Sequence, residues 1–270
     1  MDYKDFPKYY REQIEGNETI GLTFGRLSVS PTSYLREAAV HVYTKTPSQG
    51  TSAPLEPGRY TALGRFVINF SKTGGIGRWF RWTIEKYVEP KLHSCLSRNE
   101  AMSQNHACLV TRNQEMYDDM AYLNNRLRDT DILQEYFVPY ERMSKFVNSL
   151  RETVQRNGAN LLNVTIRTVH KDNVTALPYA KEDMFALVLY FNVKFNNRDN
   201  QVLEKTTTEL IDAAHQAGGT YYLPYQLFYS REQLETAYPE FKEFVAAKRK
   251  FEPRRTVYKS ILRNLWNVAG

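Results

Sequence analysis

The sequence has few cysteines, little excess of charge of either sign and no long apolar run. Its two cysteines, Cys95 and Cys108, are too few for a disulfide framework, and neither belongs to a Cys-x-x-Cys pair or to a Cys/His ligand cluster of the kind that zinc requires. The 36 Lys and Arg residues exceed the 30 Asp and Glu residues by six, so the balance is only mildly basic. These absences exclude a disulfide-rich secreted mini-protein and a zinc domain.

The sequence also has no segment that would carry it into or across a membrane. No stretch approaches the roughly 18 to 20 consecutive apolar residues that span a bilayer. Residues 1–16 are charged where a secretory signal peptide would be apolar. We therefore expect a soluble, cytoplasmic protein with no membrane span, and 42% hydrophobic residues over 270 positions can form the core of one large domain or two small ones.

Aromatic residues are abundant, because 19 Tyr, 14 Phe and 3 Trp make up 13% of the chain. Tyrosine is amphipathic and suits the walls of a cleft or an interface as well as a core. Both interpretations, a tyrosine-rich core and a tyrosine-lined binding surface, remain open at this point.

The first half alternates short apolar runs with turn residues. Period-2 patterns predict strands over 19–30 and 39–46, and a short helix is predicted to start within 30–39. The Pro, Gly and Ser content of 46–58 predicts a surface loop. Apolar residues spread around 78–92 predict a helix with both inner and outer apolar contacts, whereas 93–131 is polar and is predicted to be an ordered excursion outside the core.

The second half has clearer periodicity. Strands are predicted over 131–139, 161–169 and 185–195, and helices over 140–157, 206–219, 230–238 and 239–250. The helix over 140–157 has the i, i+3, i+4, i+7 apolar spacing of a packed helix. The order strand, helix, strand, strand, helix predicts an α+β fold, with an antiparallel or mixed sheet and helices packed on one face.

Three features could carry chemistry but have plainer interpretations. Gly74, Gly75 and Gly77 could cradle a phosphate, although their spacing matches no phosphate-binding motif and a flexible loop is the alternative. His93 and His106 flank the two cysteines without metal-ligand spacing. The basic stretches 78–82 and 246–259 contain aromatics and could contact nucleic acid, but a solvated helix end explains them better, so no nucleic-acid partner is predicted.

Two predicted strands place polar side chains on one face. The alternation puts Asn163, Thr165 and Arg167 on the same side of 161–169, opposite three apolar residues. The same alternation groups Tyr190, Asn192 and Lys194 in 185–195. Such a face is either solvated or lines a cleft.

From 129 onwards the sequence also resembles a known family. The segments DTDILQEYFVP, LLNVTIRTV, FALVLYFNVKF, GGTYYLPYQ and YPEFKEF are similar to the C-terminal half of FAD-linked oxidoreductases of the vanillyl-alcohol oxidase type, which include decaprenylphosphoryl-ribose, sugar-lactone and alditol oxidases. The earlier segments FGRLSVSPTSYLREA and SRNEAM fit the same group. The resemblance implies a cap domain over 1–252, whose antiparallel sheet covers the flavin and forms the substrate pocket, and a C-terminal tail over 253–270. The N-terminal FAD-binding domain of the family is not present in this sequence.

The resemblance implies roles for seven residues. Lys194 and Arg167 would be catalytic, because a lysine can hydrogen-bond a substrate hydroxyl or the flavin and an arginine can stabilise developing negative charge. The implied substrate-binding residues are Gln134, Tyr136, Asn163, Thr165 and Tyr190. The sequence departs from the sugar oxidases in YYLPYQ, which lacks their lysine, and at Thr165, where they carry an acid.

Two functional hypotheses follow, and they differ in class. In the first, the chain is the substrate-binding cap of an FAD-dependent oxidoreductase that oxidises a sugar-like or polyol alcohol, with FAD held by a separate subunit. In the second, the chain is a non-catalytic binding or interaction module that keeps the cap fold and self-associates or binds a partner through the exposed cap face.

Overall fold

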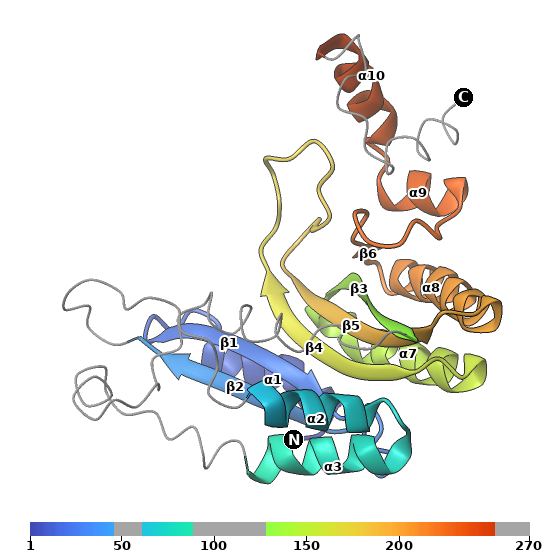
Figure 1. Cartoon of the computed structure of the whole chain (residues 1–270). Helices are drawn as coiled ribbons and strands as arrows, with labels where there is room; N and C mark the ends of the chain where they lie inside the picture. The colour runs from blue at the N-terminus through green and yellow to red at the C-terminus, as the bar shows by residue number, and fades with distance from the viewer. Residues whose placement is uncertain (46–60, 89–127, 252–270) are drawn as a thin grey trace. The chain divides into compact units, whose positions relative to one another are not determined.

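The computed structural model describes residues 1–45, 61–88 and 128–251, whose helices and strands are drawn in Figure 1. Packing divides the chain into two compact units. The first comprises Met1–Asp131 with Leu162–Val164, and the second comprises Ile132–Leu161 with Thr165–Gly270. Outside the described residues lie the predicted loop over 46–58, most of the predicted polar excursion, both cysteines with their flanking histidines, and the predicted domain boundary after residue 252.

The first unit begins with three short helical segments, η1 (Tyr3–Asp5), α1 (Phe6–Tyr9) and η2 (Tyr10–Ile14). Their buried side chains recur at helical spacing: Tyr3, Phe6, Tyr10 and Ile14. The charged residues between them face solvent, so the N-terminal segment is anchored by one apolar stripe. The sequence analysis did not predict this helical segment.

The predicted strands of the first half are confirmed as β1 (Ile20–Leu27) and β2 (Ala38–Thr44), which pair antiparallel. The predicted helix between them is wrong, because residues 30–37 form turns. The Ser28 and Ser33 hydroxyls lie 2.7 Å apart, and the Ser30 and Thr32 hydroxyls 2.9 Å apart. Such local hydroxyl bonds stabilise turns in competition with a helix, and Pro31 lies at the same place.

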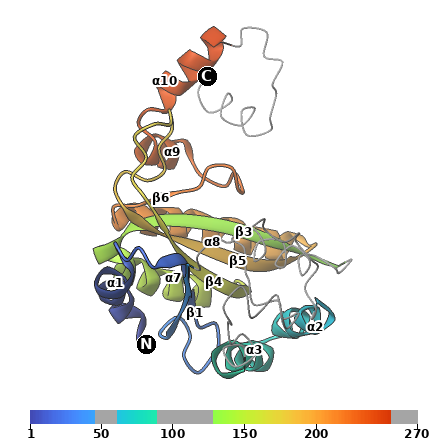
Figure 2. The same ribbon diagram turned by 90° about the vertical axis from the view of Figure 1, so that its left-hand side faces the viewer.

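Two helices, α2 (Thr61–Ser71) and α3 (Gly75–Tyr87), lie side by side in both views (Figures 1 and 2). The apolar segment at 66–70 therefore belongs to a helix. Gly77 lies where the two helices approach closely, because a Cβ at this position would lie 2.0 Å from the Phe70 carbonyl oxygen. Gly77 is thus explained by helix packing and not by a phosphate cradle.

The second unit contains four α-helices and most of the residues of four strands. In chain order these are β3 (Asp129–Pro139), α7 (Met143–Asn157), β4 (Leu161–Val169), β5 (Met184–Lys194), α8 (Asn197–Gln216), β6 (Thr220–Tyr221), α9 (Arg231–Ala237) and α10 (Phe241–Phe251). A 3-10 turn, η3 (Tyr140–Arg142), links β3 to α7. All the predicted strands and helices of this half are present, although α8 begins nine residues before the predicted start at 206, after an Asn196 cap.

The sheet has the strand order β2-β1-β4-β5-β3-β6 and is antiparallel. The α+β class with helices on the sheet is therefore confirmed. Within the second unit the chain order β3-α7-β4-β5-α8-β6 together with the spatial order β4-β5-β3-β6 is the ferredoxin-like βαββαβ arrangement. Both α7 and α8 pack on one face of these strands, which leaves the opposite face without a helix from this motif.

The core of the second unit lies between this sheet and α7 and α8. Tyr136 of β3 reaches Phe146 of α7 with a ring separation of 5.4 Å, and its hydroxyl donates to the Thr207 carbonyl of α8 at 3.4 Å. Helix α7 ends at Gly158, which adopts the left-handed conformation with φ 68°. Among the described residues, no helix has the length and apolar character needed to cross a bilayer.

Candidate ligand-binding site

Strand β4 presents its polar side chains on the face of the sheet opposite α7 and α8, as its alternation predicts. Leu162, Val164 and Ile166 are fully buried, whereas Asn163 and Thr165 are half-buried and Arg167 is exposed. The two sets point to opposite faces because side chains alternate along a strand.

Strand β5 continues this pattern, but with much less exposure. Tyr190 and Asn192 are only 9% and 6% exposed, whereas Lys194 is exposed at the strand's end. The intervening side chains lie in the core against α7 and α8. The polar residues of β5 are therefore mostly covered and do not line an open surface.

Two of the predicted substrate-binding residues lie on the helix side of β3. Tyr136 has no exposed surface and contacts α7 and α8, and burial raises the pKa of its hydroxyl, so the phenol stays neutral. Gln134, two residues earlier on the same strand, points the same way and is 4% exposed, and no residue within the described ranges hydrogen-bonds its Nε2. Neither side chain is brought to the face that carries Arg167.

The residue between them, Glu135, points to the face opposite α7 and α8 and pairs with Arg167. The Arg167 Nη2 donates to the Glu135 Oε1 at 2.6 Å, although β5 lies between β4 and β3 in the sheet. The ion pair therefore spans the middle strand. Glu135 is 7% exposed and Arg167 49% exposed at their side chains, so a buried carboxylate holds a half-exposed guanidinium.

The electrostatics of this pair are set by burial. Burial raises the pKa of Glu135, and the positive charge and hydrogen bond of Arg167 act against that rise. Burial likewise raises the pKa of the nearby Tyr225 hydroxyl, and the Glu135 carboxylate raises it further. We name these three residues, Glu135, Arg167 and Tyr225, the arginine site.

Aromatic rings form a wall beside the arginine site. Phe137 of β3 stacks on Tyr179, with 4.6 Å between ring centroids, and Tyr222 meets both rings edge-on. Tyr225 continues the group, 5.1 Å from Tyr222. Tyr179 belongs to the long β4–β5 loop that extends beyond the strands in Figure 1, and the Thr220 hydroxyl holds it by donating to its carbonyl. Tyrosine thus serves both core and surface in this region.

Lys194 is not close to Arg167. The Asn192 N–H donates to the Asn160 carbonyl at 3.0 Å, which aligns the end of β5 with the start of β4. Arg167 lies seven residues further along β4, which at 3.3 Å per residue is roughly 23 Å away. The two residues predicted to be catalytic therefore occupy opposite ends of the same pair of strands.

The arginine site includes two residues that the sequence analysis did not select, Glu135 and Tyr225. One signal points to the first residue, because Glu135 is the only carboxylate between Ile132 and Pro139. The sequence does not indicate that its partner lies two strands away. No local signal identifies Tyr225, because it comes from an irregular segment that follows β6.

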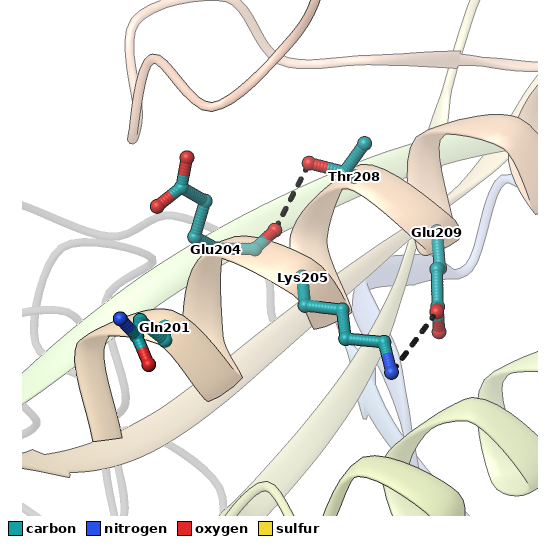
Figure 3. A pocket seen from close by; sticks show the side chains of 5 residues that line it. All are labelled: Gln201, Glu204, Lys205, Thr208 and Glu209. Atoms are coloured by element: carbon teal, nitrogen blue, oxygen red, sulfur yellow. Dashed lines mark hydrogen bonds and ion pairs between the residues drawn. The ribbon is translucent and has the colours of Figure 1, made fainter. Parts of the chain in front are cut away.

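A hollow over α8 lies apart from this site. Its lining residues all come from the one helix: Gln201, Glu204, Lys205, Thr208 and Glu209 (Figure 3). Thr208 donates to the Glu204 carbonyl at 3.0 Å, and Lys205 pairs with Glu209 at 3.9 Å. These are ordinary i, i+4 contacts of a solvated helix face, so the hollow shows no chemistry of its own.

The comparisons with protein families and with curated proteins found no relative of this chain. No protein-family model matches the chain, and no curated protein matches it either. The functional argument therefore rests on the residues and their geometry.

Proposed function

We propose that the arginine site binds a neutral, hydroxylated small molecule, and that the protein is the substrate-binding cap part of an FAD-dependent oxidoreductase acting on a sugar-like or polyol alcohol. The single observation that carries the binding proposal is the ion pair between the half-exposed Arg167 and the buried Glu135. The flavin assignment rests on the resemblance of the second half to the caps of FAD-linked oxidases.

The ion pair favours a neutral ligand over an anion. Glu135 compensates the charge of Arg167, so the remaining guanidinium N–H groups act as fixed hydrogen-bond donors without a net positive charge. The adjacent tyrosine rings offer apolar faces for the C–H groups of a sugar, and a few placed polar groups beside an aromatic wall are typical of small-molecule sites.

In the enzyme hypothesis, FAD would accept a hydride from the substrate, and this chain would bind and orient the alcohol. Arg167 would hold a substrate oxygen, Glu135 would keep the guanidinium in place, and Tyr225 would cover the site. Thr165 lies two residues from Arg167 on the same face and extends the polar surface. Lys194, at the far end of β5, would contact a different part of a bound molecule or of the FAD-binding partner.

The second hypothesis, a non-catalytic module, uses the same site without a flavin. The specific observation that favours it is that all three residues of the arginine site come from this chain. A sugar-binding module would therefore show the same ligand affinity whether or not FAD is present.

The first experiment measures binding of a named neutral polyol, sorbitol, and of the anion gluconate to the full chain by saturation-transfer NMR. We expect sorbitol to bind more tightly than gluconate. Arg167→Ala should weaken sorbitol binding by about tenfold or more, the loss expected for hydrogen bonds to a charged group. Arg231→Ala is the matched control, because Arg231 is 51% exposed and pairs with Glu235 as Arg167 pairs with Glu135. Unchanged binding in Arg167→Ala contradicts the proposed site.

A second measurement separates the two hypotheses. Purification from the native source, followed by an absorption spectrum and an FAD titration, shows whether a flavin-carrying chain accompanies this one. Flavin absorption retained with a co-purifying chain supports the split oxidoreductase. A colourless protein that binds sorbitol and leaves flavin fluorescence unchanged supports the non-catalytic module.

A further inference from the structure

The two members of the ion pair in the arginine site differ in their access to solvent. The side chain of Glu135 is 7% exposed and that of Arg167 is 49% exposed, and the Arg167 Nη2 donates to the Glu135 Oε1 at 2.6 Å. A ligand that approaches from solvent therefore contacts the guanidinium, with the carboxylate close behind it. The ligand touches one partner, but the net charge that it meets depends on both.

Glu135 is the member of this pair that can change its charge. Arginine stays protonated in proteins, whereas burial raises the pKa of Glu135 against the opposing charge and hydrogen bond of Arg167. Well above that raised pKa the carboxyl is ionised and the pair has no net charge. Below it, Glu135 takes up a proton from solvent and the pair carries one positive charge.

Apart from Arg167, the described neighbours of Glu135 keep the same charge over this pH range. Strand β5, which lies between β3 and β4 in the sheet, contributes the fully buried apolar side chains of Met184 and Ala186. The segment after β6 contributes two phenols, those of Tyr222 and Tyr225, and burial raises the pKa of the second. Because phenols ionise only in alkaline solution, the change of charge belongs to Glu135.

We propose that Glu135 is a proton-controlled selector of ligand charge in the arginine site. With Glu135 ionised, the site binds neutral polyols. With Glu135 protonated, the uncompensated guanidinium of Arg167 binds carboxylate ligands, of which sugar acids share the hydroxylated body of a polyol. The inference rests on the proposed function, since it concerns the same site. The proton comes from solvent and returns to it, and no covalent bond to the ligand forms.

The test compares the binding of gluconate and sorbitol to the full chain by NMR titration at about pH 4.5 and about pH 7.5, where gluconate is mostly ionised throughout. We expect gluconate to bind more tightly at the lower pH by about tenfold or more, because the repulsion by a nearby carboxylate is then absent. Sorbitol has no charge, so its affinity should change far less. Arg167→Ala should remove the binding of gluconate at the lower pH.

Two variants separate the carboxylate of Glu135 from other effects. Glu135→Gln keeps an oxygen that can accept from Arg167 but has no charge, so it should bind gluconate at both pH values as tightly as the wild type does at the lower one. Glu235→Gln is the matched control, because Glu235 also pairs with an arginine, Arg231 at 3.1 Å. It should keep the pH dependence of the wild type.

A histidine near the end of β4 is accounted for by the same comparison. His170 lies three residues after Arg167 and 3.5 Å from Asp183, and histidine gains positive charge as the pH falls. His170 is present in both the wild type and Glu135→Gln. A pH dependence that comes from His170 would therefore persist in Glu135→Gln, whereas one that comes from Glu135 disappears.

Two results would overturn the selector. One is an affinity of the wild type for gluconate that does not change with pH, and the other is the same pH dependence in Glu135→Gln as in the wild type. If sorbitol binding is still lost in Arg167→Ala, either result leaves the proposed function intact. Absence of sorbitol binding by the wild type at both pH values would overturn the proposed function and the selector together.

Discussion

At the scale of single residues, the arginine site depends on which side chains of β3 point away from the helices. Gln134 and Tyr136 point into the core, and Glu135 between them points to Arg167. A shift of one residue along a strand exchanges its two faces. Both faces of this segment carry apolar residues, so its pattern does not reveal which face packs against α7 and α8.

Glu135 should give the protein a distinctive dependence of stability on pH. Its pKa is raised in the folded state above the ordinary value of 4.5, so the folded chain binds this proton more tightly than the unfolded chain. Its contribution is therefore greatest at low pH, and the free energy of unfolding falls as the pH rises from about 4.5 through the raised pKa. Urea unfolding at pH values on both sides of 4.5 should therefore show that the free energy of unfolding of the wild type, relative to that of Glu135→Gln, decreases as the pH rises.

The comparison isolates Glu135 because the other carboxylates are common to both proteins. Those with lowered pKa values, such as Glu37 and Glu209, contribute the opposite trend equally in each. Parallel pH profiles for the two proteins would contradict the assignment.

Tyr136 offers a test of its position in the core. Its hydroxyl makes one long hydrogen bond, 3.4 Å to the Thr207 carbonyl, and its ring packs on Phe146. Tyr136→Phe keeps the ring, so we expect a loss of unfolding free energy of about 1 kcal/mol or less and unchanged sorbitol binding. A large loss of binding with normal stability would show that the hydroxyl contacts the ligand after all.

At the scale of elements, the sequence predicts most helices and strands because their signals are local. The capping box of α9 is an example: the Ser230 Oγ accepts from the Gln233 backbone N–H, and the Ser230 backbone N–H donates to the Gln233 Oε1, as the sequence pattern indicates. The failure at 30–37 is equally local in origin, since serine and threonine hydroxyls there stabilise turns. What sequence does not indicate is how closely two elements approach.

Gly77 tests such an approach. A methyl group there would lie 2.0 Å from the Phe70 carbonyl oxygen and 3.0 Å from the Ser71 Cα, both backbone atoms that cannot rotate away. Gly77→Ala should therefore force α2 and α3 apart and lower the free energy of unfolding by about 1 to 3 kcal/mol, the range for overpacked cores. Chemical denaturation measures the loss. Ile76→Ala, one residue away and 77% exposed in the wild type, is the control and should change stability little.

At the scale of the whole molecule, contacts between residues far apart in sequence decide what is buried. Lys72, at the α2–α3 turn, is 2.8 Å from Asp131 and 3.4 Å from Asp129, and all three side chains are at least nine-tenths buried. The two contacts join residues that are separated by 57 and 59 positions in the sequence. No local pattern predicts a buried lysine, because lysine is normally exposed unless its charge is paired.

Removing Lys72 should be costly because two buried carboxylates then lose the positive charge of its ammonium group. We expect Lys72→Ala to lower the free energy of unfolding by about 3 to 5 kcal/mol. Adding Asp129→Asn and Asp131→Asn should recover part of this loss, since no uncompensated charge then remains. Equal stabilities of the single and triple variants, measured by urea unfolding, would argue against a buried charge network.

The sequence by itself determined the α+β class, the order of the elements in the second half and the polar face of β4, because helix and strand periods and caps are encoded by near neighbours. Only the tertiary structure decided that Glu135 partners Arg167, that Lys194 lies at the other end of the strands, and that α2 and α3 cross at Gly77. These depend on strand order, register and close packing, which arise when segments distant in sequence meet. A residue's neighbours along the chain determine its local conformation, whereas its neighbours in space determine its chemistry.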